Sequence, residues 1–256
     1  MNNNSGRVTV CFYDDLPVLL AVAAKDGVVE LVLERRTSVK DLIESLGVPH
    51  TEVGRIIINR EQSDFTSIVC GDDLIDVFGQ SASVRVIESS ILRPDALVEI
   101  KFLVDVNVAK LGALLRMVGI DAAPAIDFDD QVLAQQSARE GRILLSRDRN
   151  LLRRKIVMFG RLVRAENPEE QLVEVIQLYD LLPLFRPFTR CMRCNGLLRQ
   201  VEKEEISHRL EPLTEKYYNT FHVCRCCNNL YWPGTHRERM EELLRRIVCR
   251  LDIDCH

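Results

Sequence analysis

The chain has 256 residues with a formal net charge of −4 and 46% hydrophobic residues, which is typical of a globular protein of two or three domains. No apolar run is long enough to span a bilayer, and the polar N-terminus lacks the pattern of a signal peptide. We therefore expect a cytoplasmic protein with no membrane partner. Four of the nine cysteines form two closely spaced pairs, and the total number is odd. Both features favour a metal site over a disulfide framework.

The first 88 residues predict a small α+β domain. A helix with a hydroxyl cap at its start and a glycine at its end is expected over Thr37–Gly47. Segments rich in β-branched residues predict strands on both sides of this helix. These segments are Val8–Phe12, Val28–Leu33, Arg55–Asn59 and Asp73–Phe78.

A linker near residues 81–94 leads to a second region, residues 98–184, in which predicted strands and helices alternate. Such alternation indicates a mostly parallel sheet in an α/β domain. The predicted strands are Glu99–Val104, Arg142–Ser146 and Ile156–Phe159. The predicted helices are Val108–Val118, Asp129–Glu140 and Pro168–Asp180.

The last region, residues 185–256, contains two Cys-x-x-Cys pairs and a basic amphipathic helix over Arg237–Leu251. Two such pairs, each able to turn both thiolates toward one ion, predict a structural zinc site in a ribbon. The predicted ligands are Cys191, Cys194, Cys224 and Cys227. Cys226 competes with Cys227 for the fourth position, and His222 and His236 are reserve ligands.

Acidic residues follow two of the predicted buried strands of the second region. Asp105 and Asp148 stand at the strand ends, and Asp129 and Asp130 open the helix between them. Ligands of open parallel sheets bind at the carboxyl ends of strands, and converging carboxylates favour Mg²⁺ or Mn²⁺. Each acid has a simpler interpretation, as a helix cap for Asp130 and as a turn residue for Asp148.

Residues from about 100 to 236 resemble the PIN-like Mut-seven C-terminal RNase family. Four segments carry the resemblance: Lys101–Asp105, Leu114–Asp121, Glu140–Arg149 and Tyr231–His236. The resemblance implies a PIN-like fold, a zinc ribbon and ribonuclease activity, with Asp105, Asp130 and Asp148 as the metal-binding catalytic acids. PIN nucleases usually add a fourth acid, which has no clear match in this sequence. The candidates are Asp121, Asp127 and Asp129, with Asn107 as a polar neighbour of Asp105.

The first region resembles a β-grasp, ubiquitin-like domain of the kind that bacterial members of this family often carry. The matching segments are Val53–Asn59 and Gly71–Phe78. Sulfur carriers of this type end in a free Gly-Gly tail, whereas this chain continues beyond Gly79. We therefore expect no carrier activity, and a protein partner is the alternative use of the domain.

Residues 139–164 hold nine Lys or Arg residues against two acids, so this stretch predicts contacts with RNA phosphates. The candidate RNA-binding residues are Arg116, Arg147, Arg149, Arg153 and Arg154, each of which has a surface ion pair as its alternative. Tyr231 and Trp232 either stack on RNA bases or pack the ribbon against the sheet.

Together these patterns predict a Mg²⁺- or Mn²⁺-dependent endoribonuclease. The alternative is a catalytically inactive RNA-binding or adaptor protein whose ubiquitin-like domain docks a partner. The presence of three acids favours the first interpretation, and the missing fourth acid favours the second.

Overall fold

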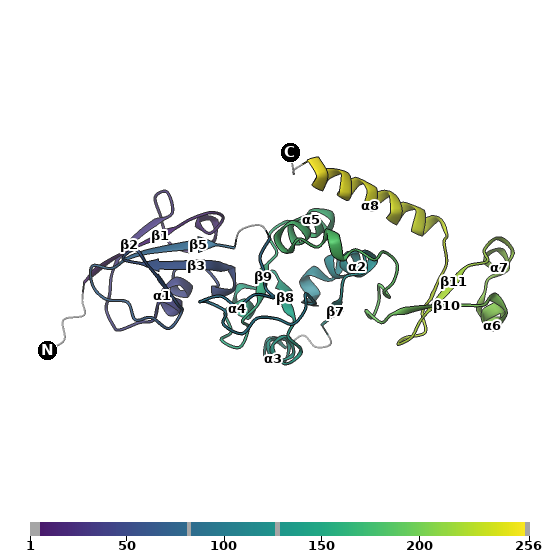
Figure 1. The fold of residues 1–256 in the computed structure, drawn as a ribbon, viewed down its shortest axis with the longest axis horizontal. Helices are drawn as coiled ribbons and strands as arrows, with labels where there is room; N and C mark the ends of the chain where they lie inside the picture. The colour runs from purple at the N-terminus through teal and green to yellow at the C-terminus, as the bar shows by residue number, and fades with distance from the viewer. Residues whose placement is uncertain (1–5, 81–82, 126–128, 254–256) are drawn as a thin grey trace. The chain divides into compact units, whose positions relative to one another are not determined.

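The computed structural model describes residues 6–80, 83–125 and 129–253 of the chain (Figure 1). Contacts divide the chain into two compact units, Met1–Ile100 with Asp127–Leu162, and Lys101–Ile126 with Val163–His256. The predicted domain boundaries at 88, 98 and 184 stay predictions, because the units follow contacts and not sequence order. None of the helices in the described ranges is long and apolar enough to cross a membrane.

The first unit begins with a mixed sheet in the order β2-β1-β5-β3-β4. The central strands β1 and β5 are parallel and the other neighbours are antiparallel. Helix α1, capped by Ser38, lies on one face of this sheet (Figure 1). The bounds are β1 Arg7–Phe12, η1 Pro17–Leu19, β2 Val28–Val32, α1 Val39–Ser45, η2 His50–Glu52, β3 Val53–Ile58, β4 Glu61–Ser63 and β5 Leu74–Gly79.

Alternating side chains of these strands build the core of the sheet. Val8, Val10 and Phe12 of β1 point inward together with Ile75 and Val77 of β5, and all are buried. This alternation is the pattern from which the strands were predicted, and the β-grasp prediction is confirmed.

The rest of the first unit consists of a parallel strand pair and two helices. Strands β8 and β9 pair in parallel, with Leu144 opposite Gly160 and Ser146 opposite Leu162. Helix α3 ends at Gly141, whose left-handed φ of 59° suits glycine. The bounds are α3 Asp130–Glu140, β8 Ile143–Ser146, α4 Arg149–Leu152 and β9 Gly160–Leu162.

The strand predicted at Ile156–Phe159 was placed wrongly, because the structure puts β9 at Gly160–Leu162. Lys155–Phe159 precede it in a turn in which the N–H of Val157 donates to the carbonyl of Arg154. Arg161 is the central residue of β9. Its charge interrupts the run of apolar residues from which a buried strand is predicted.

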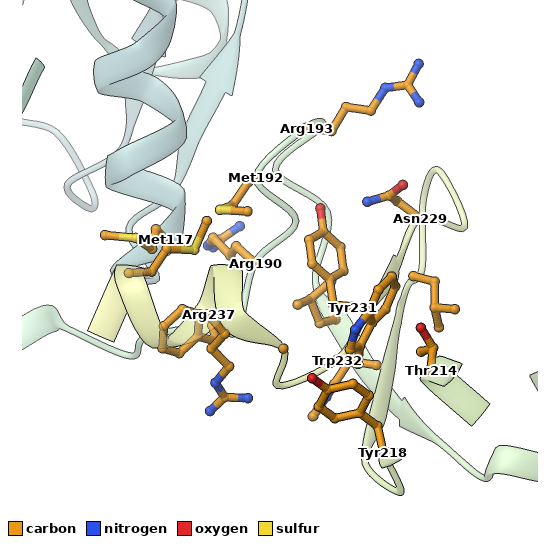
Figure 2. Close-up of a pocket in the computed structure, with 16 residues that line it drawn as sticks. Met117, Arg190, Met192, Arg193, Thr214, Tyr218, Asn229, Tyr231, Trp232 and Arg237 are labelled. Carbon is orange, nitrogen blue, oxygen red and sulfur yellow. The ribbon is translucent and has the colours of Figure 1, made fainter. Parts of the chain in front are cut away.

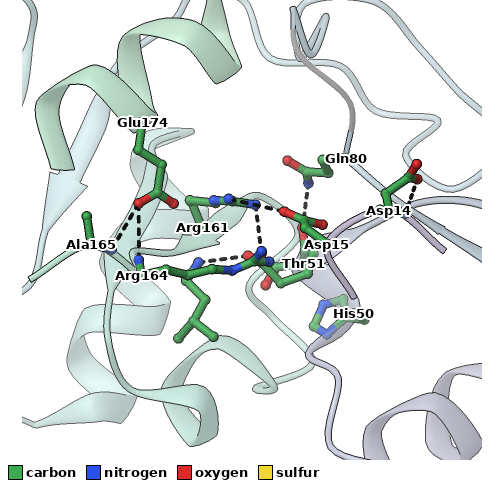
Figure 3. A network of polar contacts seen from close by, with 12 residues as sticks. Asp14, Asp15, His50, Thr51, Gln80, Arg161, Arg164, Ala165 and Glu174 are labelled. Atoms are coloured by element: carbon green, nitrogen blue, oxygen red, sulfur yellow. Dashed lines mark hydrogen bonds and ion pairs between the residues drawn. The ribbon is translucent and has the colours of Figure 1, made fainter. Parts of the chain in front are cut away.

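Arg161 is tolerated in β9 because the buried carboxylate of Glu52 and the partly exposed carboxylate of Asp15 pair with it. Glu52, which is fully buried, accepts 2.8 Å and 2.7 Å bonds from Nη1 of Arg161 and the backbone N–H of Leu162. Asp15 lies 3.5 Å from Nη2 of the same arginine (Figure 3). The β-grasp segment and β9 therefore share one desolvated ion pair.

A second arginine, Arg93, joins the same segments through backbone carbonyls. Its guanidinium donates to the carbonyls of His50, Thr51 and Val53, and its Nε donates to that of Met158. These bonds attach Arg93 to η2, to the start of β3 and to the turn before β9.

The second unit contains a parallel pair, two packed helices and a ribbon. Strand β6 pairs in parallel with β7, and helix α2, in which Leu111 and Leu115 are buried, packs against α5. Helix α8 packs on α5 with Leu244 and Ile247 buried. The bounds are β6 Phe102–Val104, η3 Val106–Val108, α2 Ala109–Met117, β7 Ala122–Pro124, α5 Pro168–Tyr179, η4 Leu182–Leu184 and α8 Thr235–Ile253.

The ribbon is an antiparallel sheet in the order β10-β11-β12. Two short helices between β10 and β11 account for the long spacer between the two cysteine pairs. A small apolar core of Val201, Ile206, Phe221 and Val223 lies beneath them. The bounds are β10 Leu198–Val201, α6 Lys203–Ile206, η5 Ser207–Arg209, α7 Pro212–Tyr217, β11 Phe221–Cys224 and β12 Leu230–Tyr231.

We expect Arg161→Met to lower the free energy of unfolding by about 3–5 kcal/mol, because it leaves Glu52 charged and buried. Urea denaturation of the full chain measures the change. The matched control is Arg7→Met, which breaks an exposed pair with Glu30 and should cost less than about 1 kcal/mol. Equal losses in the two variants would contradict the buried-pair account.

Candidate metal centre and active-site residues

The four predicted zinc ligands lie together in the ribbon. The Sγ atoms of Cys191, Cys194, Cys224 and Cys227 are all within 4.8 Å of one another. Cys191 Sγ is 3.6 Å from Cys227 Sγ, and Cys194 Sγ is 3.4 Å from Cys224 Sγ. A tetrahedral zinc with Zn–S bonds of about 2.3 Å separates its sulfurs by about 3.8 Å, so the cluster fits that ion.

The two cysteine pairs form matching turns. In each, the residue after the second cysteine is an asparagine with left-handed φ, 70° at Asn195 and 56° at Asn228. Asn195 donates its backbone N–H to the carbonyl of Cys191, and Asn228 donates likewise to Cys224. Asparagine tolerates this conformation better than most residues, so Cys-x-x-Cys-Asn is a sequence signal that the analysis of spacing alone missed.

The alternative ligands take other places. Cys226 is exposed and lies outside the cluster, while its backbone N–H points at Cys224 Sγ, 3.4 Å away. His222 is half-buried on β11 and lines a neighbouring pocket. The side chain of His236 lies outside the described residues. Among the residues that the structure describes, no other group of three or more metal-ligating side chains is as close as the four cysteines.

Tyr231 donates toward the cluster from the next strand, with its Oη 3.0 Å from Cys191 Sγ. Burial, and then the hydrogen bond with Cys191, raise the pKa of Tyr231 to about 12. The phenol therefore keeps its proton at neutral pH and can donate to a thiolate.

Arg116, predicted to contact RNA, is buried and attaches the first cysteine turn to α2. Its Nε donates to the carbonyl of Met192 at 2.7 Å, and its Nη1 donates to that of Ala122 at 2.8 Å. Burial lowers the pKa of Arg116, and nearby Cys191 and Cys194 oppose the shift. These contacts give Arg116 a structural role.

Asp121, a candidate fourth acid, belongs to the same attachment. It accepts a 2.8 Å bond from Asn195 Nδ2 and pairs with Arg190 at 3.2 Å. Asn195 Oδ1 in turn accepts the backbone N–H of Ala122. The carboxylate of Asp121 is thus engaged in holding the ribbon to β7.

Asp105 directly follows β6 and is only 5% exposed. Asn107, in η3, donates from Nδ2 to Asp105 Oδ2 at 2.6 Å, and so orients the carboxylate. A buried acid at the end of a parallel strand is the placement that the sequence predicted.

Asp148 comes two residues after β8 and caps α4. Its Oδ1 accepts the backbone N–H groups of Asn150 and Leu151. Both bonds are made to the same carboxylate oxygen.

Asp129, and not Asp130, caps α3, because its side chain accepts the N–H groups of Gln131 and Val132. Asp130 is the first helical residue and pairs with Arg154 at 3.7 Å. Of the remaining candidates for a fourth acid, Asp127 lies outside the described residues.

The arginines after β8 differ in their surroundings. Arg147 and Arg154 are exposed, and Arg153 is half-buried. Arg149 donates from Nη1 to the carbonyl of Leu19 at 2.8 Å, so its charge is directed inward.

Comparison with family models gives two matches. The model of the Mut7-C RNase domain matches residues 100–244, which is more than half of the chain, and the model of the Mut7-C ubiquitin domain matches residues 5–85. The chain belongs to the Mut7-C RNase domain family. A search of curated proteins and a search of solved structures each gave no match.

The two matches confirm the predicted resemblances, the RNase match over residues 100–244 and the ubiquitin match over residues 5–85. The RNase match indicates a nuclease-like function. The matched residues include all three predicted acids and the four cysteines. The cysteine cluster indicates structural zinc binding, since four thiolates leave no open position for a substrate.

We expect one zinc ion per chain and expect Cys194→Ser to abolish its binding. The small core of the ribbon makes folding of residues 185–236 dependent on the metal. Elemental analysis after dialysis measures the zinc, and limited proteolysis reports the folding of the ribbon.

The matched control is Cys226→Ser, which removes the exposed thiol next to the cluster and should retain a full equivalent of zinc. A folded ribbon without zinc, or equal zinc loss in both variants, would rule out this ligand set.

Proposed function

We propose that this protein is a Mg²⁺- or Mn²⁺-dependent endoribonuclease whose metal-binding catalytic acids are Asp105, Asp130 and Asp148. The observation that carries the proposal is the RNase family match, within which Asp105 directly follows β6 and Asp148 comes two residues after β8, each strand being a member of a parallel pair. The proposal requires the carboxyl ends of β6 and β8 to meet at one edge of a sheet, as parallel connections favour.

Each acid is suited to hold a cation in a different way. Asn107 fixes the carboxylate of Asp105, and the helix cap fixes that of Asp148. Asp130 has only a long ion pair with Arg154, which a divalent cation would displace. A bound divalent ion would activate water for attack on the phosphodiester and stabilise the leaving oxygen.

The zinc has a structural role in this proposal. It would close the ribbon at the four cysteines, and Arg116 and Asp121 would transmit that order to α2 and β7. The ribbon would therefore support the nuclease domain without taking part in the chemical step.

RNA phosphates are proposed to contact the basic side chains after β8. Arg147, Arg153 and Arg154 are the candidates, since Arg149 and Arg116 donate to backbone carbonyls of the protein. Arg154 would change partners, from Asp130 to a phosphate, when the acids receive a cation.

The ubiquitin-like domain is proposed to dock a protein partner on the outer face of its sheet. The strand register places Val28, Val32 and Leu74 on this face, and all three are exposed. Exposed aliphatic side chains gathered on one face are typical of protein-binding surfaces.

We expect Asp148→Asn to lower the rate of single-stranded RNA cleavage by more than the roughly 10–100-fold that loss of an outer-shell partner costs. Asparagine also caps helices, so α4 should stay intact while the charge that binds the cation is lost. Cleavage is measured with added Mg²⁺ or Mn²⁺ and with no added metal.

The matched control is Asp180→Asn, which removes one charge at an exposed helix end where asparagine accepts the left-handed φ of 49°. It should cleave RNA at the parent rate. Equal rates for Asp148→Asn and the parent would refute the proposed catalyst. No cleavage by the parent with either metal would favour the inactive, RNA-binding alternative.

A further inference from the structure

A pocket of about 710 Å³ opens beside the cysteine cluster, within the second unit. It lies between the end of α2, the first cysteine turn, the strands of the ribbon and the start of α8. Its volume is within the range of about 300–1,000 Å³ that small-molecule sites occupy. Neither the acids of the proposed nuclease nor the cysteine ligands line it.

One wall of the pocket is aromatic. Figure 2 shows Tyr218, Tyr231 and Trp232 along one side, facing Met117 and Met192 on the other. Trp232, the only tryptophan of the chain, is 39% exposed and so does not complete the packing of the ribbon. Flat rings and adaptable thioethers together form a slot suited to a planar group.

Gly234 makes room for the indole of Trp232. A Cβ atom at this buried glycine would lie 3.0 Å from Trp232 Nε1 and 3.3 Å from its Cδ1. The N–H of Gly234 also donates to the carbonyl of Trp232, so a tight turn holds the ring. The indole of Trp232 therefore lies directly against the backbone of Gly234.

Three arginines line the pocket, although the net charge of the whole chain is −4. Arg190, Arg193 and Arg237 line it, and no Asp or Glu is among its lining residues in the described part of the chain. Arg190 pairs with Asp121 at 3.2 Å, and Arg237 lies over the ring of Phe188 at 4.5 Å and pairs with Glu241 at 2.9 Å. Arg193 is exposed, and no ion pair within the described ranges engages its guanidinium.

We propose that this pocket binds an unpaired base of single-stranded RNA, stacked on Trp232, with the adjoining phosphates facing the arginine rim. Stacking on an aromatic ring beside cationic side chains is how proteins hold single strands without base pairing. The choice of RNA rests on the proposed ribonuclease function. The binding itself follows from the rings and charges of the pocket.

The test uses the full chain with Asp148→Asn, so that RNA is bound and not cleaved, and its probe is a fluorescently labelled eight-nucleotide single strand. Because Trp232 is the only tryptophan, its fluorescence reports the pocket directly. We expect an unlabelled strand of the same sequence to quench the fluorescence of Trp232 saturably. The affinity from this quenching should equal the affinity from the fluorescence anisotropy of the labelled strand. Trp232→Leu should weaken RNA binding by roughly 5- to 150-fold.

Two further variants separate stacking from general effects. Trp232→Phe keeps a ring and should retain most of the affinity. Tyr217→Leu removes an aromatic ring that is 67% exposed in the same ribbon but does not line the pocket, and should leave the affinity unchanged. Zinc content and circular dichroism establish that each variant is folded.

Equal RNA affinity of Trp232→Leu and its parent, or RNA binding without quenching, would overturn the proposal and leave the pocket to a protein ligand. Failure of the ribonuclease proposal has a different signature, which is absence of cleavage by the parent chain with either metal while the RNA affinity still depends on Trp232.

Discussion

Four sulfur atoms within 4.8 Å of one another are the constraint on which the second unit depends. As thiolates they repel, and a divalent cation turns this repulsion into a crosslink between residues 191 and 227. The turns that carry the sulfurs also carry the groups that attach the ribbon to the nuclease domain. Arg116 reaches the carbonyl of Met192, and Asn195 connects Asp121 with the backbone of Ala122. The first of these turns also lines the aromatic pocket, through Met192 and Arg193.

Buried arginines connect elements within each unit, and their burial explains why the RNA contact predicted for Arg116 and the charge count of the basic block misled. Arg161 and Arg116 lie in basic or family-matching stretches, yet their guanidinium groups pair with Glu52 or with backbone carbonyls. Composition counts charges and does not distinguish a desolvated arginine from one that faces solvent. Within the block 139–164, exposure separates Arg147 and Arg154 from Arg161.

Much of the fold was predictable because local signals agreed with tertiary packing. Alternating apolar residues identified β1 and β5, and a cap with a terminal glycine identified α3. The cysteine spacing identified the cluster, since two close pairs have few other uses. The strand at Gly160–Leu162 was missed because its central arginine is compensated by Glu52, which lies 109 residues away in the sequence. The pocket was missed because its walls come from α2, the ribbon and α8, and only Tyr231 and Trp232 hinted at it.

The central claim is that acids of two parallel strand pairs hold a divalent cation while cysteines hold zinc. A crystal structure of the zinc-bound protein soaked in Mn²⁺, with anomalous scattering measured at energies that separate the two metals, tests it most directly. The account predicts zinc at the four cysteines and manganese bound by carboxylate oxygens of Asp105 and Asp148 at roughly 2.0–2.3 Å, close to the bond lengths of Mg²⁺ sites. Manganese absent from these carboxylates, or bound only elsewhere on the chain, would contradict it.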